Sequence, residues 1–237
     1  MAIDRTRRAW ILCVVFGVGV LALLAWFAAV IPTQTCTGRQ PKGTSPFLAF
    51  QLSRTAADLE VVFGPEGDPC RADMIAALDL ANKVDLIAFI AAYSGFFVCF
   101  FLALMRSSFA GLARVGLVAV VFTLCSDVLE TSVQLYITSS LPAPALALVL
   151  LTIGSTGKFL GLAAVGVCAG AAMLAGGGVL GRLAGAACVA GALMAVVGLN
   201  YSPAQRAVPA GSALIWLVVF LYAAQAAVRR RPSRGSP

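Results

Sequence analysis

The sequence predicts an all-α fold, a polytopic transmembrane helix bundle with six spans. Of the 237 residues, 60% are hydrophobic and only 11% are charged, whereas a soluble domain carries about 25% charge. The mean hydropathy is +0.94, and apolar runs near the length of a bilayer-spanning helix recur along the chain. Lipid offers the backbone no hydrogen-bond partners, so each such run is expected to be helical.

Six apolar runs define the predicted spans. They are Trp10–Ile31, Val84–Met105, Val115–Ile137, Ala145–Leu174, Leu183–Leu199 and Ser212–Val228. The chain is accordingly divided into an N-terminal segment (1–9), the first helix (10–32), a long loop (33–83), helices two to four (84–174), helices five and six (175–228) and a basic tail (229–237). The fourth run is longer than a bilayer requires, which predicts a tilted helix.

The first run has two interpretations. A cleaved signal peptide has an apolar core of about 7–15 residues followed by small residues at the cleavage site. The run at Trp10–Ile31 is longer than that, and "TQTC" before Cys36 lacks the small residues. A retained membrane anchor is therefore favoured.

Arginine placement predicts the orientation. Cytoplasmic loops of membrane proteins are enriched in Lys and Arg. With the N-terminus inside, the two short outer loops hold only Arg206, and the inner segments hold Arg5, Arg7, Arg8, Arg106, Arg114, Arg182, Arg229, Arg230, Arg231 and Arg234. We therefore expect a multi-pass protein of the plasma (inner) membrane with both termini cytoplasmic. The tail "RRRPSR" is interpreted as a topology determinant, with a lipid or partner site as the alternative.

The long extracytoplasmic loop of about 50 residues contains two of the seven cysteines, Cys36 and Cys70. In the predicted topology both face an oxidising compartment, where disulfides persist, so a Cys36–Cys70 disulfide is expected. The remaining cysteines lie singly within spans, where a small buried hydrophobic side chain is the ordinary role.

Short amphipathic helices are expected within this loop. "TAAD" at Thr55–Asp58 is typical of a helix start, and Gly64 with Pro65 is typical of a helix end. Such a segment lies on the membrane surface, covers the mouth of the bundle or packs on the helix tops. "CRADMIAALDLANKVD" predicts a helix that continues into the second span.

The third span carries a polar face. At 100° per residue one side of the helix collects Thr123, Asp127, Glu130, Thr131 and Gln134. An ionised side chain at mid-membrane costs about 2.5–3.5 kcal/mol, while a Leu or Val returns only about 0.3–0.6 kcal/mol. This face therefore needs partners inside the bundle.

Lys158 is the predicted partner because it is the basic residue well inside a span. Gly154 and Gly161 share its helix face, where glycine lets another helix approach closely. The depths of Asp127 and Lys158 agree within the reach of a lysine side chain. The sequence leaves Asp127–Lys158 and Glu130–Lys158 open as pairs, and one acid remains without a cation.

The second span adds Asp85 and Tyr93 to this polar cluster. Asp85 lies near the predicted interface, so simple solvation is an alternative for it. Tyr93 is deeper, and its hydroxyl is expected to bond to an acid. The whole cluster is either a structural ion-pair network that fixes helix register or a coupling site for protons, cations or a polar substrate.

Several chemistries are excluded by composition. The chain has no histidine, which removes imidazole metal sites and Ser-His-Asp triads. It has no C-x-x-C motif, and "GSTGK" around Lys158 lacks the first glycine and the final Ser or Thr of a phosphate loop. Its arginines lie at chain ends and short loops, which argues against nucleic acid. We therefore predict no enzyme activity, no catalytic residue, no metal and no cofactor.

The last two spans and the end of the fourth are rich in Gly and Ala. Gly157/Gly161, Gly166/Gly170 and Gly181/Gly185 are small-xxx-small pairs. They predict close packing within the bundle, with a homo-oligomer or a membrane partner as the alternative. The lipid bilayer is the other expected partner.

The order of these motifs resembles that of a group of uncharacterised bacterial multi-pass membrane proteins with a D-x-x-E-N transmembrane motif. The likeness includes "FQLSRTAAD", the Asp85–Tyr93 span, Asp127 with Glu130, and Lys158. It covers about half the chain, and Thr131 stands where the motif has Asn. The resemblance implies that Asp85, Asp127, Glu130 and Lys158 form one constellation, and it implies no substrate.

Two functions remain open. The sequence favours an integral inner-membrane protein of the accessory, sensor or structural kind with an intramembrane acid–lysine network. The alternative is a small proton- or ion-coupled transporter that uses Asp127, Glu130 and Lys158. A water-accessible cavity that reaches Asp127 and Glu130 from one side would favour transport, and a dry ion pair would favour the structural role.

Overall fold

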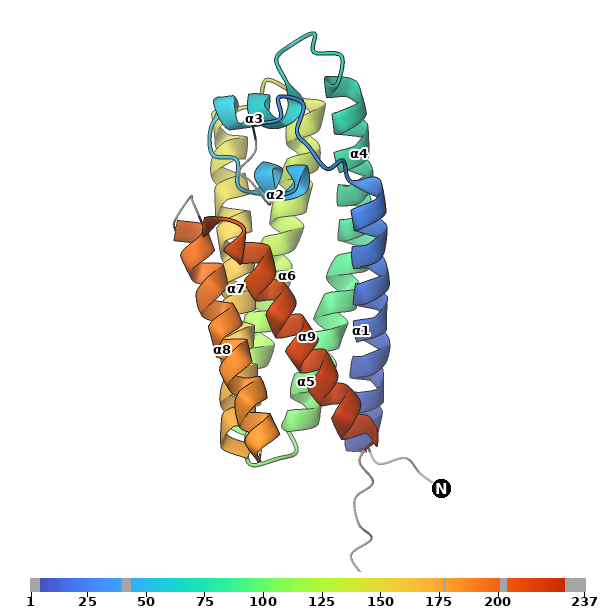
Figure 1. Cartoon of the computed structure of the whole chain (residues 1–237), viewed down its shortest axis with the longest axis vertical. Helices are drawn as coiled ribbons and strands as arrows, with labels where there is room; N and C mark the ends of the chain where they lie inside the picture. The colour runs from blue at the N-terminus through green and yellow to red at the C-terminus, as the bar shows by residue number, and fades with distance from the viewer. Residues whose placement is uncertain (1–4, 40–43, 177, 201–203, 229–237) are drawn as a thin grey trace, which may run out of the picture.

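The computed structural model describes residues 5–39, 44–176, 178–200 and 204–228, and these residues contain helices and no strands. The helices form one elongated bundle, shown in Figure 1. The predicted all-α class is confirmed. The basic tail at 229–237 lies outside the described residues.

Within the part of the chain that the structure describes, six helical segments are long and apolar enough to cross a membrane, as predicted. They are α1 (Arg5–Val30), the continuous run of α4 (Arg71–Val84), η1 (Asp85–Phe89) and α5 (Ile90–Leu104), then α6 (Ala110–Ser139), α7 (Ala145–Gly176), α8 (Val179–Asn200) and α9 (Ala207–Val228). The expected continuation of the "CRAD" helix into the second span is confirmed. The chain is an integral membrane protein.

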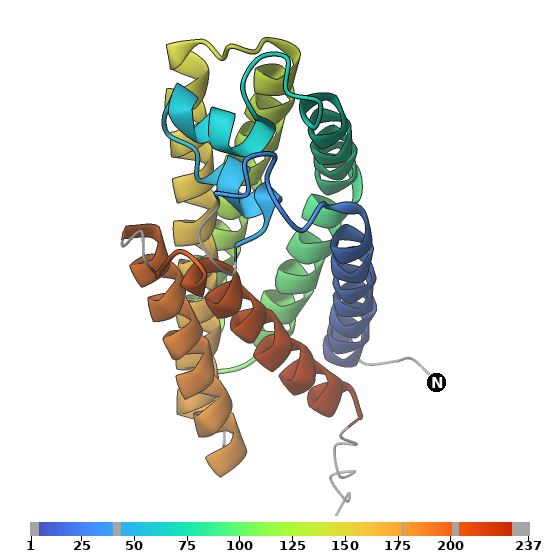
Figure 2. The ribbon, with the colours of Figure 1, turned by 45° about the horizontal axis from the view of Figure 1, so that its top comes forward.

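The sequence order of the helices sets their neighbours. Helices α6, α7 and α8 pack one against the next, and α1 packs against α5. Helix α9 runs obliquely across the bundle from α8 toward the start of α1 (Figures 1 and 2). As a result α1 and α9 are close at one end of the bundle and splayed at the other (Figure 2).

The splayed end is covered by the long loop, and we call it the cap end. The cap contains α2 (Pro46–Gln51) and α3 (Ala56–Phe63), and the predicted disulfide between Cys36 and Cys70 is present. Helix α3 begins as predicted, because Thr55 and Asp58 form a reciprocal capping box, and Gly64 ends it with a positive φ of 73°.

Apolar residues of the cap pack on the tops of the helices. Phe50 and Phe63 are buried against each other, with ring centroids 5.0 Å apart, in a cluster with Leu78, Ile137 and Leu151 of α4, α6 and α7. Packing on the helix tops was one of the predicted alternatives, and it is confirmed for this part of the loop.

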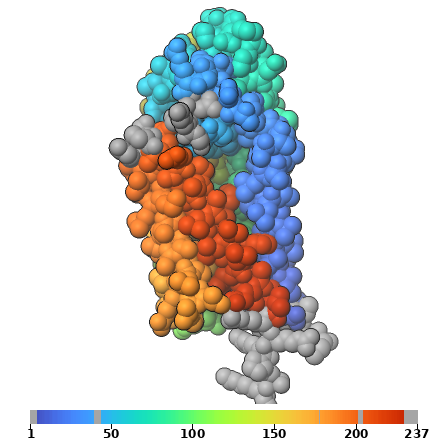
Figure 3. All heavy atoms as spheres, viewed as in Figure 1, coloured from blue at the N-terminus to red at the C-terminus, as the bar shows by residue number. Residues whose placement is uncertain are grey.

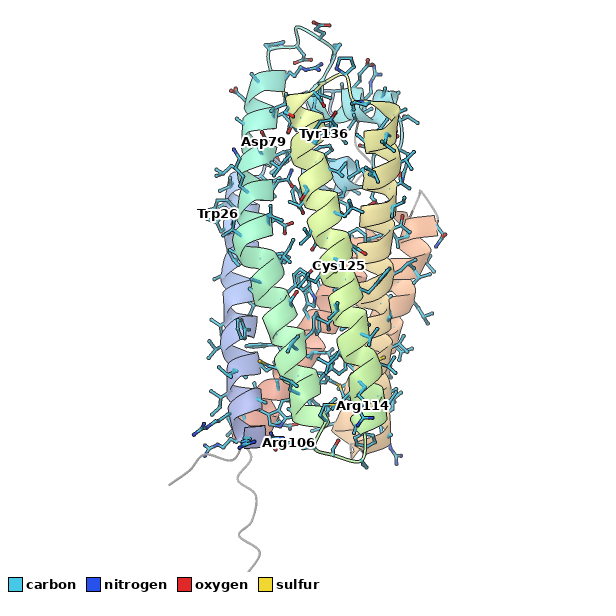
Figure 4. The ribbon with its side chains drawn as sticks, turned by 180° about the vertical axis from the view of Figure 1, so that it is seen from behind. Trp26, Asp79, Arg106, Arg114, Cys125 and Tyr136 are labelled. Atoms are coloured by element: carbon cyan, nitrogen blue, oxygen red, sulfur yellow. A yellow bond between two sulfur atoms is a disulfide. The ribbon has the colours of Figure 1, made fainter. Side chains whose placement is uncertain are left out.

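The opposite end contains Arg106 and Arg114 (Figure 4), and we call it the arginine end. Its interior is filled by buried phenylalanines of α5: Phe96, Phe97, Phe100 and Phe101. Trp10 of α1 makes edge-to-face contacts with Phe100 and with Tyr222 of α9, at 5.6 and 5.9 Å between centroids. These contacts join α1, α5 and α9 tightly at the arginine end.

Candidate functional site: a pocket above a buried ion-pair network

Lys158 is paired with both acids of the third span. Its Nζ donates to Glu130 Oε1 at 2.6 Å, and it lies 3.1 Å from Asp127 Oδ1 as an ion pair without hydrogen-bond geometry. All three side chains are buried between α6 and α7. Of the two pairings that the sequence left open, the structure therefore contains both.

Glycines bring α6 and α7 close enough for this network. A Cβ on Gly154 would lie 2.8 Å from the backbone nitrogen of Glu130, and one on Gly161 would meet Thr123. Glycine is therefore required on the lysine face of α7, as its spacing predicts. The hydroxyl of Thr123 donates to its own helix, at Ala119 O, and takes no part in the ion pairs.

Asp85 and Tyr93 join the cluster from the second span. The Tyr93 hydroxyl donates to Asp127 Oδ2 at 2.8 Å, which confirms the expected bond from Tyr93 to an acid. The Thr131 hydroxyl donates to Asp85 Oδ2, also at 2.8 Å. Asp85 is only 3% exposed, so it lies inside the bundle, contrary to its alternative role as a solvated interfacial residue.

Arg54 is a second cation at the cluster, and the sequence reasoning missed it. Its Nη2 donates to Ser155 Oγ on α7 at 3.1 Å, and its Nη1 donates to the carbonyls of Gln51 and Ser53. Burial lowers the pKa of the Arg54 guanidinium, while the negative charges of Glu130 and Asp58 oppose that shift. The positive charge of Arg54 is therefore attracted electrostatically by Glu130.

The position of Arg54 follows from local structure. Its backbone N–H donates to Asp58 Oδ2 at 2.9 Å, directly before the capping box of α3. That bond fixes the turn between α2 and α3 and directs the side chain toward α7. In the sequence, the only indication was the short distance from Arg54 to the predicted helix start.

The cluster carries more acids than cations. Three carboxylates, Asp85, Asp127 and Glu130, face the two cations Lys158 and Arg54. With all groups ionised, the formal sum is −3 + 2 = −1. The expectation that either Asp127 or Glu130 would lack a cation is wrong, because Lys158 pairs with both. Among the described residues, the acid of this cluster without an ion pair is Asp85, which accepts a hydrogen bond from the neutral Thr131.

A cavity of about 580 Å³ lies above this cluster, between the splayed ends of α1 and α9. In Figure 3 the surface is hollowed between these two helices, beneath the cap. Its floor includes Asp85, Asp127 and Lys158, and Glu130 does not line it. Ser212 and Trp216 of α9 line one side, and Phe47 and Gln51 of α2 line the roof.

Aromatic rings form much of the cavity wall. The lining rings are Phe27, Phe47, Phe89, Tyr93, Phe159 and Trp216. They contact one another in sequence: Phe27–Phe89 at 5.4 Å, Phe89–Trp216 at 5.4 Å and Tyr93–Trp216 at 6.3 Å between centroids. Lys158 Nζ lies 5.0 Å from the centroid of Phe159. The cavity therefore has an aromatic wall and a charged floor.

Gln134, the last residue of the predicted polar face, is fully buried but has no bonded side-chain partner among the described residues. The same is true of Asn82 on α4. Both amides lie outside the ion-pair network.

No known protein family, curated protein or solved structure matches the chain. The class of the protein therefore rests on its own fold and site: an integral membrane protein with a buried acid–lysine cluster beneath a pocket. The resemblance to proteins with a D-x-x-E-N motif stays a prediction.

Proposed function

We propose that this chain is a membrane-embedded binding protein of the accessory or sensor kind. Its ligand is an amphipathic organic cation, which binds between α1 and α9. The observation that carries the proposal is the cavity of about 580 Å³ whose floor includes Asp85, Asp127 and Lys158. A purely structural ion-pair network needs no such opening, and ligand sites usually have volumes of about 300–1,000 Å³.

The wall and floor of the cavity support a cationic ligand. Aromatic faces attract cations within about 6 Å of the ring centroid, and Phe89, Tyr93 and Trp216 are adjacent. The positive charge of Lys158 is shared between Glu130 and Asp127, while Asp85 faces the cavity without an ion pair among the described residues. A positively charged ligand would balance the remaining carboxylate.

The rest of the lining supports a hydrophobic body on that ligand. Leu24, Phe27, Ala28 and Ile31 of α1 and Leu162 of α7 line the cavity. Helices α1 and α9 diverge toward the cap end (Figure 2), so a molecule dissolved in the adjacent lipid leaflet could enter between them. We infer that the cap end is extracytoplasmic, because Arg106 and Arg114 lie at the opposite end (Figure 4).

A binding role agrees better with the helix packing than transport does. Transport requires access to the site from both sides of the membrane in turn. The cavity lies near the cap end, between α1 and α9, whereas Phe96, Phe97, Phe100 and Phe101 fill the interior below it. The second candidate is a proton- or ion-coupled transporter. It is favoured by the excess of carboxylates, since a surplus acid could carry a proton.

Aqueous access to the cavity can be tested by thiol labelling. In a background without the five unpaired cysteines, Ser212→Cys places a thiol in the cavity lining. We expect a small charged thiol reagent, added from the extracytoplasmic side, to modify it. Ala192→Cys, which is buried between helices outside the cavity, is the matched control and should stay unmodified. Failure to label Ser212→Cys would overturn the proposed pocket.

Charge selectivity can be tested with two probes of similar shape and opposite charge. We expect tetraphenylphosphonium to quench tryptophan fluorescence of the purified protein saturably, and tetraphenylborate to have no saturable effect. Asp127→Asn should weaken binding of the cation by about 5- to 30-fold, which corresponds to one or two kcal/mol. The Thr152 hydroxyl donates to its own helix at Leu148 O, so Thr152→Val should bind the cation like wild type.

Two results would change the proposal. Equal binding of both probes would overturn cation selectivity. Uptake of tetraphenylphosphonium into proteoliposomes, driven by a pH gradient and lost in Glu130→Gln, would replace the sensor function with coupled transport.

A further inference from the structure

The second span, in α4 and the first residue of η1, is joined to α6 by two polar contacts. The Thr138 hydroxyl donates to Asp79 Oδ1 at 2.7 Å, and the Thr131 hydroxyl donates to Asp85 Oδ2 at 2.8 Å. The two helices are therefore antiparallel, since a higher residue number on one pairs with a lower number on the other. Figure 4 shows α4 and α6 side by side, with Asp79 toward the cap end.

Asn82 and Gln134 lie between the two hydrogen-bonded pairs, Asp79–Thr138 and Asp85–Thr131. Asn82 is halfway between Asp79 and Asp85, and Gln134 is between Thr131 and Thr138. On antiparallel helices these intermediate positions lie at the same height, three or four residues from each bonded pair. The two amides therefore face the same interface, one from each helix.

Both amides are fully buried, and neither has a partner for its oxygen or its nitrogen among the described residues. A buried polar group without a hydrogen bond destabilises the fold, and native proteins satisfy such groups with protein atoms or ordered water. A buried water molecule usually makes about three hydrogen bonds. Each amide offers an acceptor and two donors, which suits water, whereas the donor groups would repel a cation.

We infer that ordered water bridges Asn82 and Gln134 and completes a hydrogen-bonded column from Asp79 to Asp85. Through this column a proton can reach the buried acids without passing through the ligand cavity. In one transfer, the Thr131 O–H bond breaks as its proton forms an O–H bond at Asp85, and Thr131 takes a proton from the adjacent water, which receives one in turn. The proton that enters comes from the solution beside Asp79, which is partly exposed.

A proton route to Asp85 that is separate from the cavity would let Asp85 exchange protons while a ligand occupies the cavity. The charged groups near Asp85 are Asp127 and Glu130 of α6 and Lys158 of α7, with Arg54 of the cap beyond them. Lys83 on α4 is exposed, and α1 and α9 contribute the uncharged Phe27 and Trp216 to the shared cavity. A ligand in the cavity would cover Asp85, and the column leaves its other side connected to solution.

The water itself is the first test, and it does not depend on the proposed ligand. In an experimental structure at a resolution that shows water, we expect density within hydrogen-bond distance of both Asn82 and Gln134. A direct bond between the two amides, an empty gap, or a metal ion at the shorter distances of cation–oxygen contacts would each overturn the inference.

The second test measures proton access with the cavity closed. The reporter is the infrared carbonyl band of Asp85 at a pH low enough to protonate it, followed after transfer into D2O and assigned with Asp85→Asn. The cavity is blocked by a bulky thiol reagent on Ser212→Cys. We expect the band to shift quickly in the blocked protein, and about 5- to 30-fold more slowly once Asn82→Leu and Gln134→Leu are added, which corresponds to the loss of one or two hydrogen bonds.

The control is Thr152→Val in the blocked protein, which should exchange at the original rate. Slow exchange caused by the block alone would show that protons use the cavity and would overturn the column. Equal rates with and without the two leucines would also overturn it. If the double variant does not fold, each single substitution is measured against the same control. If Ser212→Cys does not label, the proposed pocket fails while the water test above still stands.

Discussion

The contact between α6 and α7 and the contact between α1 and α9 show two ways in which helices of one membrane bundle can meet. Along α7, Gly154, Gly157 and Gly161 bring the backbone against α6. Along α1 and α9, bulky rings form the contact at the arginine end, and the helices diverge toward the cap end. Small residues close the first interface, so charges can pair inside it. The interface between α1 and α9 is built from aromatic rings, and where it diverges it leaves the cavity whose floor includes Asp127 and Lys158.

This difference explains where the cavity lies. Lipid provides no hydrophobic drive for helix association, so close packing decides which helices stay together. Helices α6 and α7 are closely packed over most of their length, whereas the close packing of α1 and α9 includes Trp10 with Tyr222 and Gly17 with Phe220, on the side of the arginine end. Four variants test this comparison, in order of decreasing expected effect.

Removing the lysine should have the largest effect. In Lys158→Met the carboxylates of Asp127 and Glu130 lose the cation buried between them, and breaking a buried ion pair costs about 3–5 kcal/mol. Unfolding of the protein in detergent, followed by circular dichroism, measures the loss. The matched control adds Asp127→Asn and Glu130→Gln, and we expect it to recover most of the stability. A single Lys158→Met variant as stable as wild type would show that the tight interface does not depend on its charges.

Removing the disulfide should have the next largest effect. Cys36 and Cys70 are 34 residues apart, and closing a loop of this length is worth roughly 3–4 kcal/mol in the chain-entropy model. We expect Cys36→Ser/Cys70→Ser to lower the unfolding midpoint and to abolish the change in gel mobility caused by reductant. Because Phe47 and Gln51 of the cap line the cavity, labelling of Ser212→Cys should also become faster. Unchanged mobility of wild type with and without reductant would contradict the disulfide.

Adding one methyl group to the tight interface should have a smaller effect. In Gly154→Ala the new Cβ would lie 2.8 Å from the nitrogen and 2.9 Å from the Cα of Glu130. Backbone atoms cannot rotate away, so α6 and α7 must separate, and overpacking of this kind costs about 1–3 kcal/mol. The same unfolding measurement applies. Gly19→Ala on α1 is the control, because no atom lies within 4 Å of its new Cβ.

The tight interface was largely predictable from the sequence. Asp127 and Glu130 lie on one helix face, Lys158 is the buried cation, and Gly154 and Gly161 flank it, so charge balance and close approach identify the same pair of helices. Helical periodicity and the cost of charges in lipid determine all of these features locally.

The cavity and Arg54 were not predictable in this way. Their positions depend on how α9 returns across the bundle and how the cap folds on the helix tops, which no short sequence pattern encodes. Phe89 and Trp216 are separated by more than a hundred residues, and each alone resembles an ordinary apolar residue of a span. Arg54 in a polar loop resembles a solvated residue until the α3 capping box fixes its direction.

The smallest effect is expected from the same methyl group in the open interface. In Gly17→Ala the new Cβ would meet the ring of Phe220, 2.5 Å from Cδ2, and the ring of Phe96 at 3.2 Å. A ring can rotate, at a cost of about 0.5–1.5 kcal/mol for an off-rotamer position, while replacing glycine by alanine in a helix gains up to about 1 kcal/mol. These terms nearly cancel, so the unfolding midpoint should stay close to that of wild type. Displacement of Phe220 should still move α1 from α9, and thiol labelling of Ser212→Cys should accelerate. A loss of stability as large as that of Gly154→Ala would mean that the α1–α9 interface is as rigid as the α6–α7 interface, and that the cavity above it is fixed in width.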